Sequence, residues 1–310
     1  MTFQQLEYII AVDKSRHFVN AATACNVSQA ALSTAIAKLE QEMDVIIFDR
    51  SKHPIEPTSM GKLIIQQAET ILHNSEQLRA LVQNEKEEIV GQLMLGFAPS
   101  VAPVIAPHFG RHLTQIAPAL QVHIHEHPSA RLVEQLLRAE LDMIIINNTD
   151  VNYANLLNID LWTERFVLYA SSSHQLFHRE SIRPEEMMDG NIWTLRSFHD
   201  HYPQLTEITH QPTMRQTHLE SGNLHTLVSA VDANGGFTLL PESFTFGLSP
   251  AQREGVHRIN SGKFFRTISL AVREDYMRER MLNVVIDVIK RIIPSELLST
   301  RITKFETVKL

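Results

Sequence analysis

The spacing of apolar residues changes character near Gly91, and this change constrains the fold more than any other feature of the chain. Before Gly91, apolar residues recur every three or four positions, as they do on one face of a helix. After Gly91, short apolar runs alternate with amphipathic segments, which predicts strands alternating with helices and a largely parallel sheet. The 310 residues therefore divide into a helical part and an α/β part.

Three short helical patterns occupy about the first 40 residues. Their apolar stripes are Leu6, Ile9, Ile10 and Val12; Phe18, Ala21, Ala22 and Cys25; and Leu32, Ala35, Ile36 and Leu39. A tight turn at Asn26 and an N-cap at Ser28 separate the second helix from the third. Residues 46–48, followed by a polar stretch with Pro54 and Pro57, predict a strand, a loop and a returning strand. We therefore assign residues 1–57 to a winged helix-turn-helix domain.

A long helix is predicted from Thr58, which can act as its N-cap, to about residue 88. Its apolar positions follow steps of four and three, with Ser75 filling one step, and they are Ile64, Ala68, Ile71, Ser75, Leu78 and Val82. A seam of this kind favours pairing with the same helix of a second chain. Packing against its own domain is the alternative. Residues 58–90 are thus expected to be a linker and dimerisation helix.

Residues 91–310 are predicted to form two α/β lobes. The expected strands are 93–97, 120–125, 143–146, 166–170, 192–195, 214–219, 237–240 and 265–272, and the expected helices are about 101–115, 129–139, 223–234 and 277–290. The chain crosses near Glu164 and returns near Thr267. Lobe I therefore comprises about 91–163 and 267–310, and lobe II about 164–266. Ligands of such sheets bind at the carboxyl ends of strands.

Charge and cysteine usage exclude several classes of protein. The formal net charge of −7 excludes a basic protein that coats nucleic acid, but it allows a local DNA-reading element. The single cysteine, Cys25, excludes an intrachain disulfide and suits a reducing cytoplasm. We interpret Cys25 as a small core residue rather than a redox group. A cytoplasmic location is expected because no signal peptide and no apolar run near the ~18 residues of a membrane span is present.

Several motifs occur together in one order along the chain. They are Ala21-Ala22, Val27-Ser28-Gln29, Leu32-Ser33, Ile36, Leu39-Glu40, Ile47-Phe48-Asp49-Arg50, Pro57-Thr58, Gly61, Gly91-Gln92-Leu93-Met94-Leu95-Gly96 and Gly235-Gly236-Phe237. With this set the chain resembles the LysR-type transcriptional regulators over about its whole length. The expected fold class is α/β: an N-terminal all-α winged helix-turn-helix, a long linker helix, then two periplasmic-binding-protein-like lobes.

The resemblance also implies a function and a set of partners. It implies a sequence-specific transcription regulator that binds double-stranded DNA, is controlled by a small-molecule effector, and is not an enzyme. It implies a homodimer through helix 58–88, a homotetramer through separate pairing of the effector domains, and RNA polymerase as a further partner. It implies no cofactor and no membrane contact.

Within the family, the chain is most similar to the peroxide-sensing branch, as His17-Phe18, the run 98–103 and Trp193 suggest. Members of that branch use a redox cysteine that follows a histidine in the second lobe. Counting from Trp193 places Asp200 at the position of that cysteine, so thiol chemistry is impossible there. We therefore expect a non-covalent effector, and a neutral or zwitterionic one because Asp200 disfavours an anion.

The third helix is predicted to lie in the major groove, with its N-terminal residues at base edges. The expected base-facing residues are Gln29, Ala30, Ser33, Thr34 and Ala37, and the expected phosphate contacts are Ser28, Ser33, Lys38, Arg50 and Lys52. The alternative is that Gln29 and Thr34 are simply solvated. The family usually has proline where Ala30 stands. Residues 1–66 hold six basic and seven acidic side chains, which predicts weak binding per monomer.

Polar residues at strand ends mark the expected effector site. Ser100, Ser129 and Asn223 each follow a strand and open a helix, where free N–H groups favour an anion or a polar oxygen. Plain N-capping is the alternative. His199 and Asp200 complete the expected effector residues, because the corresponding loop lines the cleft in the relatives; an ordinary polar loop is the other interpretation.

A row of alternating histidines, His123, His125 and His127, could bind zinc or nickel from one face of a strand. We favour an exposed face with Val122 and Ile124 turned inward, and we assign no metal site. Two other functions fit a two-lobed clamp: a solute-binding or carrier module, and a small-acid enzyme using His199 and Asp200 as acid and base. The first lacks a signal peptide, and the second lacks any known catalytic motif.

Overall fold

The computed structural model describes residues 1–52, 54–84, 89–150, 155–188, 190–195, 214–219, 223–262 and 264–304. The expected effector residues His199 and Asp200 lie outside these ranges. The chain forms two compact units. Unit 1 comprises Met1–Glu87 and Leu137–Glu140, and unit 2 comprises Glu88–Leu136 and Leu141–Leu310.

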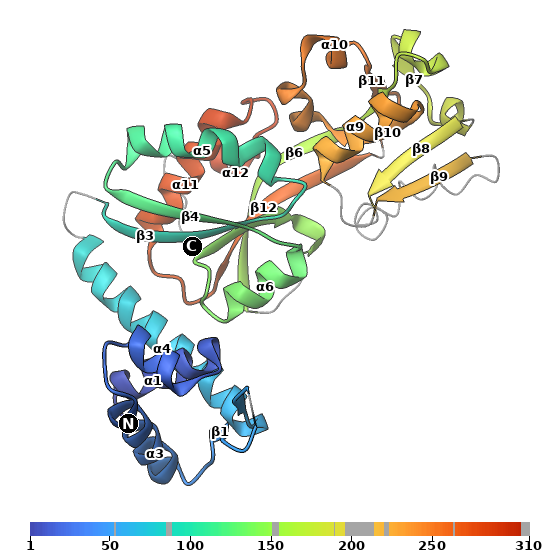
Figure 1. Cartoon of the computed structure of the whole chain (residues 1–310). Coiled ribbons are helices and arrows are strands. Elements are labelled where there is room, and N and C mark those ends of the chain that lie inside the picture. Colours follow the sequence, from blue (N-terminus) through green and yellow to red (C-terminus); the bar gives the residue numbers. More distant parts are fainter. Residues whose placement is uncertain are drawn as a thin grey trace. The chain divides into compact units, whose positions relative to one another are not determined.

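Unit 1 contains the expected helix-turn-helix and wing (Figure 1). Its elements are α1 (Phe3–Ser15), α2 (Phe18–Ala24), α3 (Gln29–Met43), β1 (Phe48–Asp49), β2 (Glu56–Pro57) and α4 (Ser59–Asn84). Strands β1 and β2 pair antiparallel, with Phe48 opposite Pro57, and form the wing. Ser28 caps α3 as expected, since its hydroxyl oxygen accepts a hydrogen bond from the Ala31 N–H.

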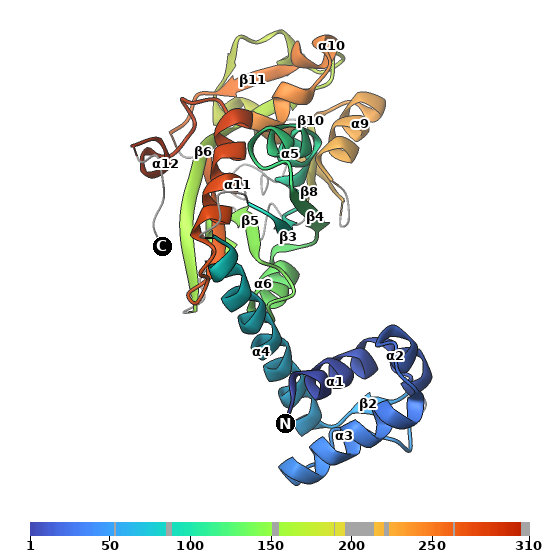
Figure 2. The ribbon, with the colours of Figure 1, turned by 90° about the vertical axis from the view of Figure 1, so that its left-hand side faces the viewer.

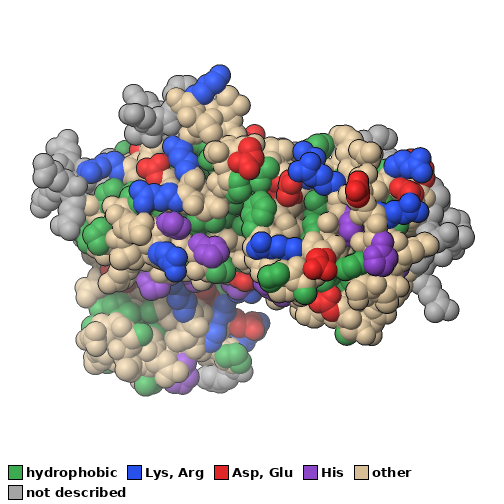
Figure 3. Space-filling view, turned by 90° about the horizontal axis from the view of Figure 1, so that it is seen from above, with side chains coloured by type: hydrophobic (Ala, Val, Ile, Leu, Met, Phe, Trp, Pro, Cys, Tyr) green, Lys and Arg blue, Asp and Glu red, His purple; other side chains and the backbone are tan. Residues whose placement is uncertain are grey.

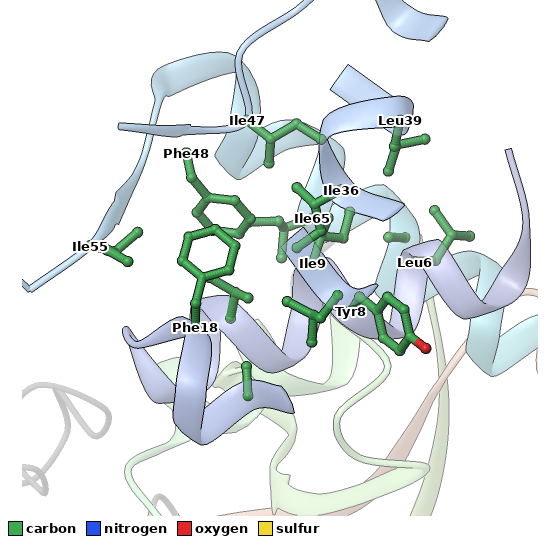
Figure 4. Close-up of a cluster of buried hydrophobic side chains, with 14 of the residues drawn as sticks. Leu6, Tyr8, Ile9, Phe18, Ile36, Leu39, Ile47, Phe48, Ile55 and Ile65 are labelled. Carbon is green, nitrogen blue, oxygen red and sulfur yellow. The ribbon is translucent and has the colours of Figure 1, made fainter. Parts of the chain in front are cut away.

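The apolar stripes of α1, α2 and α3 meet in one core (Figure 4). Ile9, Leu32, Ile36 and Leu39 are completely buried in it, and Leu6 is nearly so. The rings of Phe18 and Phe48 pack edge to face, with centroids 6.2 Å apart. This contact attaches the wing to α2, because Phe48 belongs to β1 and Phe18 begins α2.

Thr58 caps α4 as predicted, since its hydroxyl oxygen accepts a hydrogen bond from the Gly61 N–H. The Thr58 N–H donates to the Ile47 carbonyl at 2.9 Å, so the first turn of α4 lies against the wing. This approach requires a glycine at position 61, since a Cβ there would lie 2.0 Å from the Ile47 carbonyl oxygen.

The first half of α4 packs against its own domain. Ala68 is buried in the core of unit 1, and Ile64 and Ile71 pack against that core. Of these residues, Ala68 therefore follows the alternative of packing against its own domain, while Ile64 and Ile71 are half-buried and keep part of their surface exposed. Leu78, further along, is 64% exposed.

Unit 2 is built on one ten-stranded mixed sheet. Its strands are β3 (Gly91–Phe97), β4 (Leu120–Glu126), β5 (Met143–Asn147), β6 (Leu156–Ala170), β7 (Ser181–Ile182), β8 (Gly190–Leu195), β9 (Met214–Leu219), β10 (Phe237–Pro241), β11 (Val256–Ile259) and β12 (Phe265–Arg273). The main path runs β4-β3-β5-β12-β6-β10-β8-β9, and β11 pairs with β6 and β7.

Helices cover both faces of the first lobe's sheet, with α5 and α11 on one face and α6 on the other (Figure 1, and Figure 2 for α5 beside α11). The helices of unit 2 are α5 (Ala102–Ile116), α6 (Ser129–Leu137), α9 (Leu224–Asn234), α10 (Pro250–Arg253), α11 (Glu279–Ile292) and α12 (Thr300–Lys304). The last two residues of the expected helix 129–139 fall outside α6. Ala139 has a positive φ of 59°, which ends the helix.

Two strands carry the chain between the lobes. β6 is a single strand of 15 residues, so the expected strand 166–170 is only its last third. Through Arg165 it pairs antiparallel with β12, and from Phe166 onward it pairs with β10. Glu164 stands directly opposite Arg266 in this ladder. The change of partner between Arg165 and Phe166 separates the two lobes.

Acidic and basic side chains are interspersed on the face shown in Figure 3, and the described side chains there form no extended single-sign patch. Among the described helices, none is long and apolar enough to span a bilayer.

Candidate nucleic-acid interface and effector site

The predicted base-reading residues lie on the outer face of α3. Leu32, Ile36 and Leu39 fill the core from one side of this helix. Of the side chains expected to face bases, Gln29, Ala30, Thr34 and Ala37 are exposed and Ser33 is half-buried; Lys38, expected at a phosphate, is exposed. An exposed row at the N-terminal half of the second helix is what major-groove reading requires.

Two of the predicted phosphate-contacting residues lie together. Arg50 Nη1 donates to the Ser33 hydroxyl at 3.4 Å, and Arg50 Nη2 donates to Glu40 at 3.0 Å. The Arg50 guanidinium also lies over the Phe18 ring, 5.3 Å from its centroid. Arg50 thus bridges the wing to α2 and α3 while remaining 45% exposed.

Lys52, the other wing residue, pairs with Glu56 at 2.6 Å. Both side chains are more than half exposed, and ion pairs between exposed side chains contribute little to stability. Lys52 could therefore give up Glu56 for a DNA phosphate at little cost in stability.

Glu40 is a functional candidate that the sequence reasoning missed. One carboxylate oxygen accepts from the N–H groups of Ile47 and Phe48, at 2.8 and 3.2 Å, and the other accepts from Arg50. Its side chain is 14% exposed. An acidic residue directly after the core residue Leu39 was the available signal.

Ser100 and Ser129 occupy equivalent places in the first lobe. β3 and β4 are parallel neighbours, with Phe97 opposite Glu126 at their carboxyl ends. Each serine comes three residues after one of these paired positions, so both lie at the same edge of the sheet. Ser129 is the first residue of α6, as expected, while α5 begins two residues after Ser100.

A buried ion pair lies against Ser100. Arg266 Nη1 donates to the Ser100 hydroxyl at 3.0 Å, and Nη2 donates to the Ser100 carbonyl at 3.2 Å. The same guanidinium pairs with Glu164 at 2.8 Å, and both side chains are fully buried. Glu164 also accepts hydrogen bonds from Trp162 Nε1 and the Ser243 N–H, at 3.1 and 2.7 Å.

The sequence reasoning did not single out Glu164 and Arg266. The available signal was a pair of opposite charges in two segments rich in apolar residues, Glu164 two residues after Trp162 and Arg266 directly after Phe265. Charged side chains are almost never fully buried unless they are paired.

Asn223 is an N-cap. Its side-chain oxygen accepts from the N–H and the hydroxyl of Thr226, so it caps α9.

His123 and His125 lie on β4, an edge strand of the sheet, and His127 directly follows it. Ile124 is 37% exposed, so the expectation that it turns inward is wrong; an edge strand lacks a neighbour to cover it. The rings of His125 and His127 are 6.5 Å apart between centroids. In the described part of the chain, no three His, Cys, Asp or Glu side chains are arranged to hold a metal ion.

Two family profiles match the chain. Residues 3–62 match the bacterial regulatory helix-turn-helix protein, lysR family, and residues 86–292 match the LysR substrate binding domain. The chain belongs to the LysR family. It is a DNA-binding transcription regulator with an effector-binding domain, and LysR proteins are transcription regulators rather than enzymes.

Similar LysR proteins include several peroxide regulators. The hydrogen peroxide-inducible genes activator of Haemophilus influenzae is 31% identical over 301 residues, covering 94% of this chain and 99% of that protein. The DNA-binding transcriptional dual regulator OxyR of Escherichia coli K12 is 31% identical over 242 residues, covering 78% of this chain and 79% of that protein.

Solved LysR structures agree with the fold. Full-length OxyR from Pseudomonas aeruginosa, in a cysteine-to-aspartate form, has a TM-score of 0.79 and 30% identity, covering 97% of this chain and 98% of that chain. Full-length CbnR complexed with its target DNA has a TM-score of 0.64 at 17% identity, covering 94% of this chain and 100% of that chain. The second likeness shows the fold alone.

Proposed function

We propose that this LysR-family regulator reads double-stranded DNA through α3 and responds to a small molecule bound non-covalently beside Ser100 and Ser129. The pairing of Arg266 with Glu164 beside Ser100 carries the proposal for the effector. Because the Ser100 hydroxyl oxygen accepts from Arg266, its hydrogen points elsewhere and can be donated to a ligand.

The neutralisation of Arg266 by Glu164 favours one class of effector beside Ser100. Glu164 supplies the charge opposite to Arg266, so the buried guanidinium is not an uncompensated cation awaiting an anion. A neutral or zwitterionic molecule with a hydrogen-bond acceptor suits the Ser100 hydroxyl. His199, Asp200 and Asn223 remain further candidates for the same site, the first two outside the described residues.

The properties of Cys25 support a non-covalent trigger. The Haemophilus influenzae relative is a hydrogen peroxide-inducible genes activator, whereas the single cysteine of this chain packs against the core of unit 1. Burial, and to a lesser degree the nearby Glu7 carboxylate, raise the pKa of the Cys25 thiol above its usual value. A raised pKa lowers the fraction of reactive thiolate at neutral pH.

A thermal-shift screen of neutral and zwitterionic metabolites tests the effector site. A ligand present at 100 times its Kd should stabilise the protein by about 2.7 kcal/mol. Ser100→Ala and Ser129→Ala should each reduce the shift relative to the unliganded variant, whereas Ser181→Ala, an exposed serine on β7, should not. A hit that stabilises all three variants equally places the site elsewhere. A peroxide effect on DNA affinity in Cys25→Ser contradicts the argument from missing thiols.

Base reading is tested at Gln29. Glutamine can pair with adenine through two hydrogen bonds, so Gln29→Ala should lose about 1–3 kcal/mol of discrimination at one base pair. Selection from a random duplex library with each variant measures this loss. Gln41→Ala, an exposed position near the other end of α3, is the matched control and should keep the parent's preference. An unchanged preferred sequence in Gln29→Ala shows that Gln29 is not a base reader.

We further propose a homodimer through helix 58–88 and a homotetramer through the effector domains, with RNA polymerase as an additional partner. LysR regulators oligomerise. Among the described side chains of α4, Leu63 and Leu78 are 61% and 64% exposed and are available to a partner helix. In this proposal residues 1–57, 58–90 and 91–310 serve as DNA-binding, linker and effector segments.

A further inference from the structure

We propose that Glu40 is a positioning residue for DNA binding, which docks the wing on α3 and aims Arg50 at the DNA backbone. This inference rests on the proposed function, in which Arg50 contacts a phosphate. Glu40 itself touches no DNA in this arrangement. One oxygen of its carboxylate binds the backbone at the start of the wing, and the other binds Arg50.

The first oxygen holds the chain where it leaves α3 and enters the wing. It accepts hydrogen bonds from two consecutive N–H groups, those of Ile47 and Phe48, at 2.8 and 3.2 Å. Carboxylate acceptors make backbone hydrogen bonds of this kind roughly twice as strong as neutral ones do. β1 begins at Phe48, so the start of the wing is fixed to the end of the recognition helix.

The second oxygen restrains the Arg50 guanidinium. Arg50 Nη2 lies 3.0 Å from it, while Arg50 Nη1 reaches the Ser33 hydroxyl at 3.4 Å. The Phe18 ring limits the guanidinium on a third side, 5.3 Å from the centroid. An arginine held at three points loses less rotamer entropy on meeting a phosphate.

Exposure distinguishes the two partners of this ion pair. Arg50 is 45% exposed and Glu40 is 14% exposed, so the cation faces solvent and the carboxylate lies behind it. Arginine has five N–H donors, and those not directed at Glu40 and Ser33 remain for a phosphate. Ser33 belongs to the predicted base-facing row, so Arg50 is held beside the same surface.

Glu40→Gln separates positioning from net charge. The amide oxygen of glutamine can still accept from the Ile47 and Phe48 N–H groups, but its NH₂ group cannot accept from Arg50. The matched control is Glu42→Gln, which makes the same charge change two residues further along α3. Glu42 is exposed and pairs with the N-terminal amine at 2.7 Å instead.

The probe is a duplex selected from a random library by the parent protein, with affinity measured by fluorescence anisotropy over a range of salt concentrations. Glu42→Gln removes a negative charge and should tighten binding or leave it unchanged. Glu40→Gln should weaken binding by about tenfold, the loss expected for one charge-assisted hydrogen bond, although it makes the same charge change. Its slope of log affinity against log salt should also fall by about one.

Arg50→Gln, alone and combined with Glu40→Gln, completes a double-mutant cycle. The cycle separates the phosphate contact of Arg50 from the positioning role of Glu40. If Glu40 acts through Arg50, Glu40→Gln should have no further effect in the Arg50→Gln background. An Arg50→Gln variant with parental affinity and salt slope overturns the phosphate contact in the proposed function. Weak binding by Arg50→Gln together with parental binding by Glu40→Gln overturns the positioning role alone, as do equal affinity changes in Glu40→Gln and Glu42→Gln.

Discussion

Glu164→Ala is expected to lower the free energy of unfolding of the effector-binding domain by about 3–5 kcal/mol, the cost of leaving a buried charge unpaired. The variant leaves the fully buried Arg266 guanidinium without its carboxylate partner and removes the acceptor of the Ser243 N–H. Both tryptophans, Trp162 and Trp193, lie in unit 2. Tryptophan fluorescence during urea unfolding therefore reports on this domain.

The neighbouring ion pair provides a matched control. Arg165 and Glu242 are 3.5 Å apart and 45% and 22% exposed. Glu242→Ala should therefore cost less than about 1 kcal/mol. Replacing Glu164 and Arg266 together by methionine should recover most of the stability, since an apolar pair of similar volume often substitutes for a buried ion pair. Equal losses in Glu164→Ala and Glu242→Ala contradict the assignment of a stabilising role to the buried pair.

Gly61→Ala is expected to disrupt the contact between the wing and α4. The added Cβ lies 2.0 Å from the Ile47 carbonyl oxygen and 2.9 Å from its carbon, and backbone atoms cannot move aside by changing rotamer. Overpacking of this kind costs about 1–3 kcal/mol or more. Hydrogen–deuterium exchange on peptides covering residues 45–65 should show faster exchange, because the Thr58 N–H donates to the same Ile47 carbonyl. DNA affinity should fall with the loss of the docked wing.

Gly110→Ala is the matched control, because both glycines lie in helices. Nothing lies within 4 Å of a Cβ built on Gly110. The substitution should therefore stabilise α5 by about 0.5–1 kcal/mol through helix propensity alone. Parental exchange rates in Gly61→Ala contradict the close approach of Ile47 to α4.

The helix-turn-helix could be predicted in detail because its information is local. The stripe of Leu32, Ile36 and Leu39 repeats at helical spacing. Serine is a typical N-cap residue, and Ser28 caps α3 in the structure. Both signals lie within about one helix length of sequence and do not depend on distant partners.

The long strand β6 shows where local reasoning fails. Asn158 and Asp160 interrupt the apolar residues at 156–162, so this stretch was not recognised as a strand. The alternation of polar and apolar residues was nevertheless a strand signal. Asp160 is satisfied by contacts that only the fold provides, since it accepts hydrogen bonds from the Ser269 hydroxyl at 2.6 Å and from the Asn148 amide at 2.7 Å.

The sequence could predict that Ser100 and Ser129 share one edge of the sheet, but not which side chains lie beside them. Ser100 and Ser129 follow recognisable strands and open helices, so their common sheet edge was predictable. Arg266 reaches Ser100 across 166 positions of the chain, and its pairing with Glu164 depends on the register of β6 against β12. Periodicity within a segment carries no information on the register between two distant strands.

The two strands that pass between the lobes also limit how the lobes can move. A hinge made of loops swings by rotating a few backbone dihedrals. Here β6 and β12 are paired through the crossing, with Arg165 opposite Phe265 and Glu164 opposite Arg266, so a swing that separated the strands would break ladder hydrogen bonds. A change of twist breaks none, and paired strands vary widely in twist. We therefore expect an effector that moves the lobes to twist or bend the β6–β12 ribbon without separating its strands.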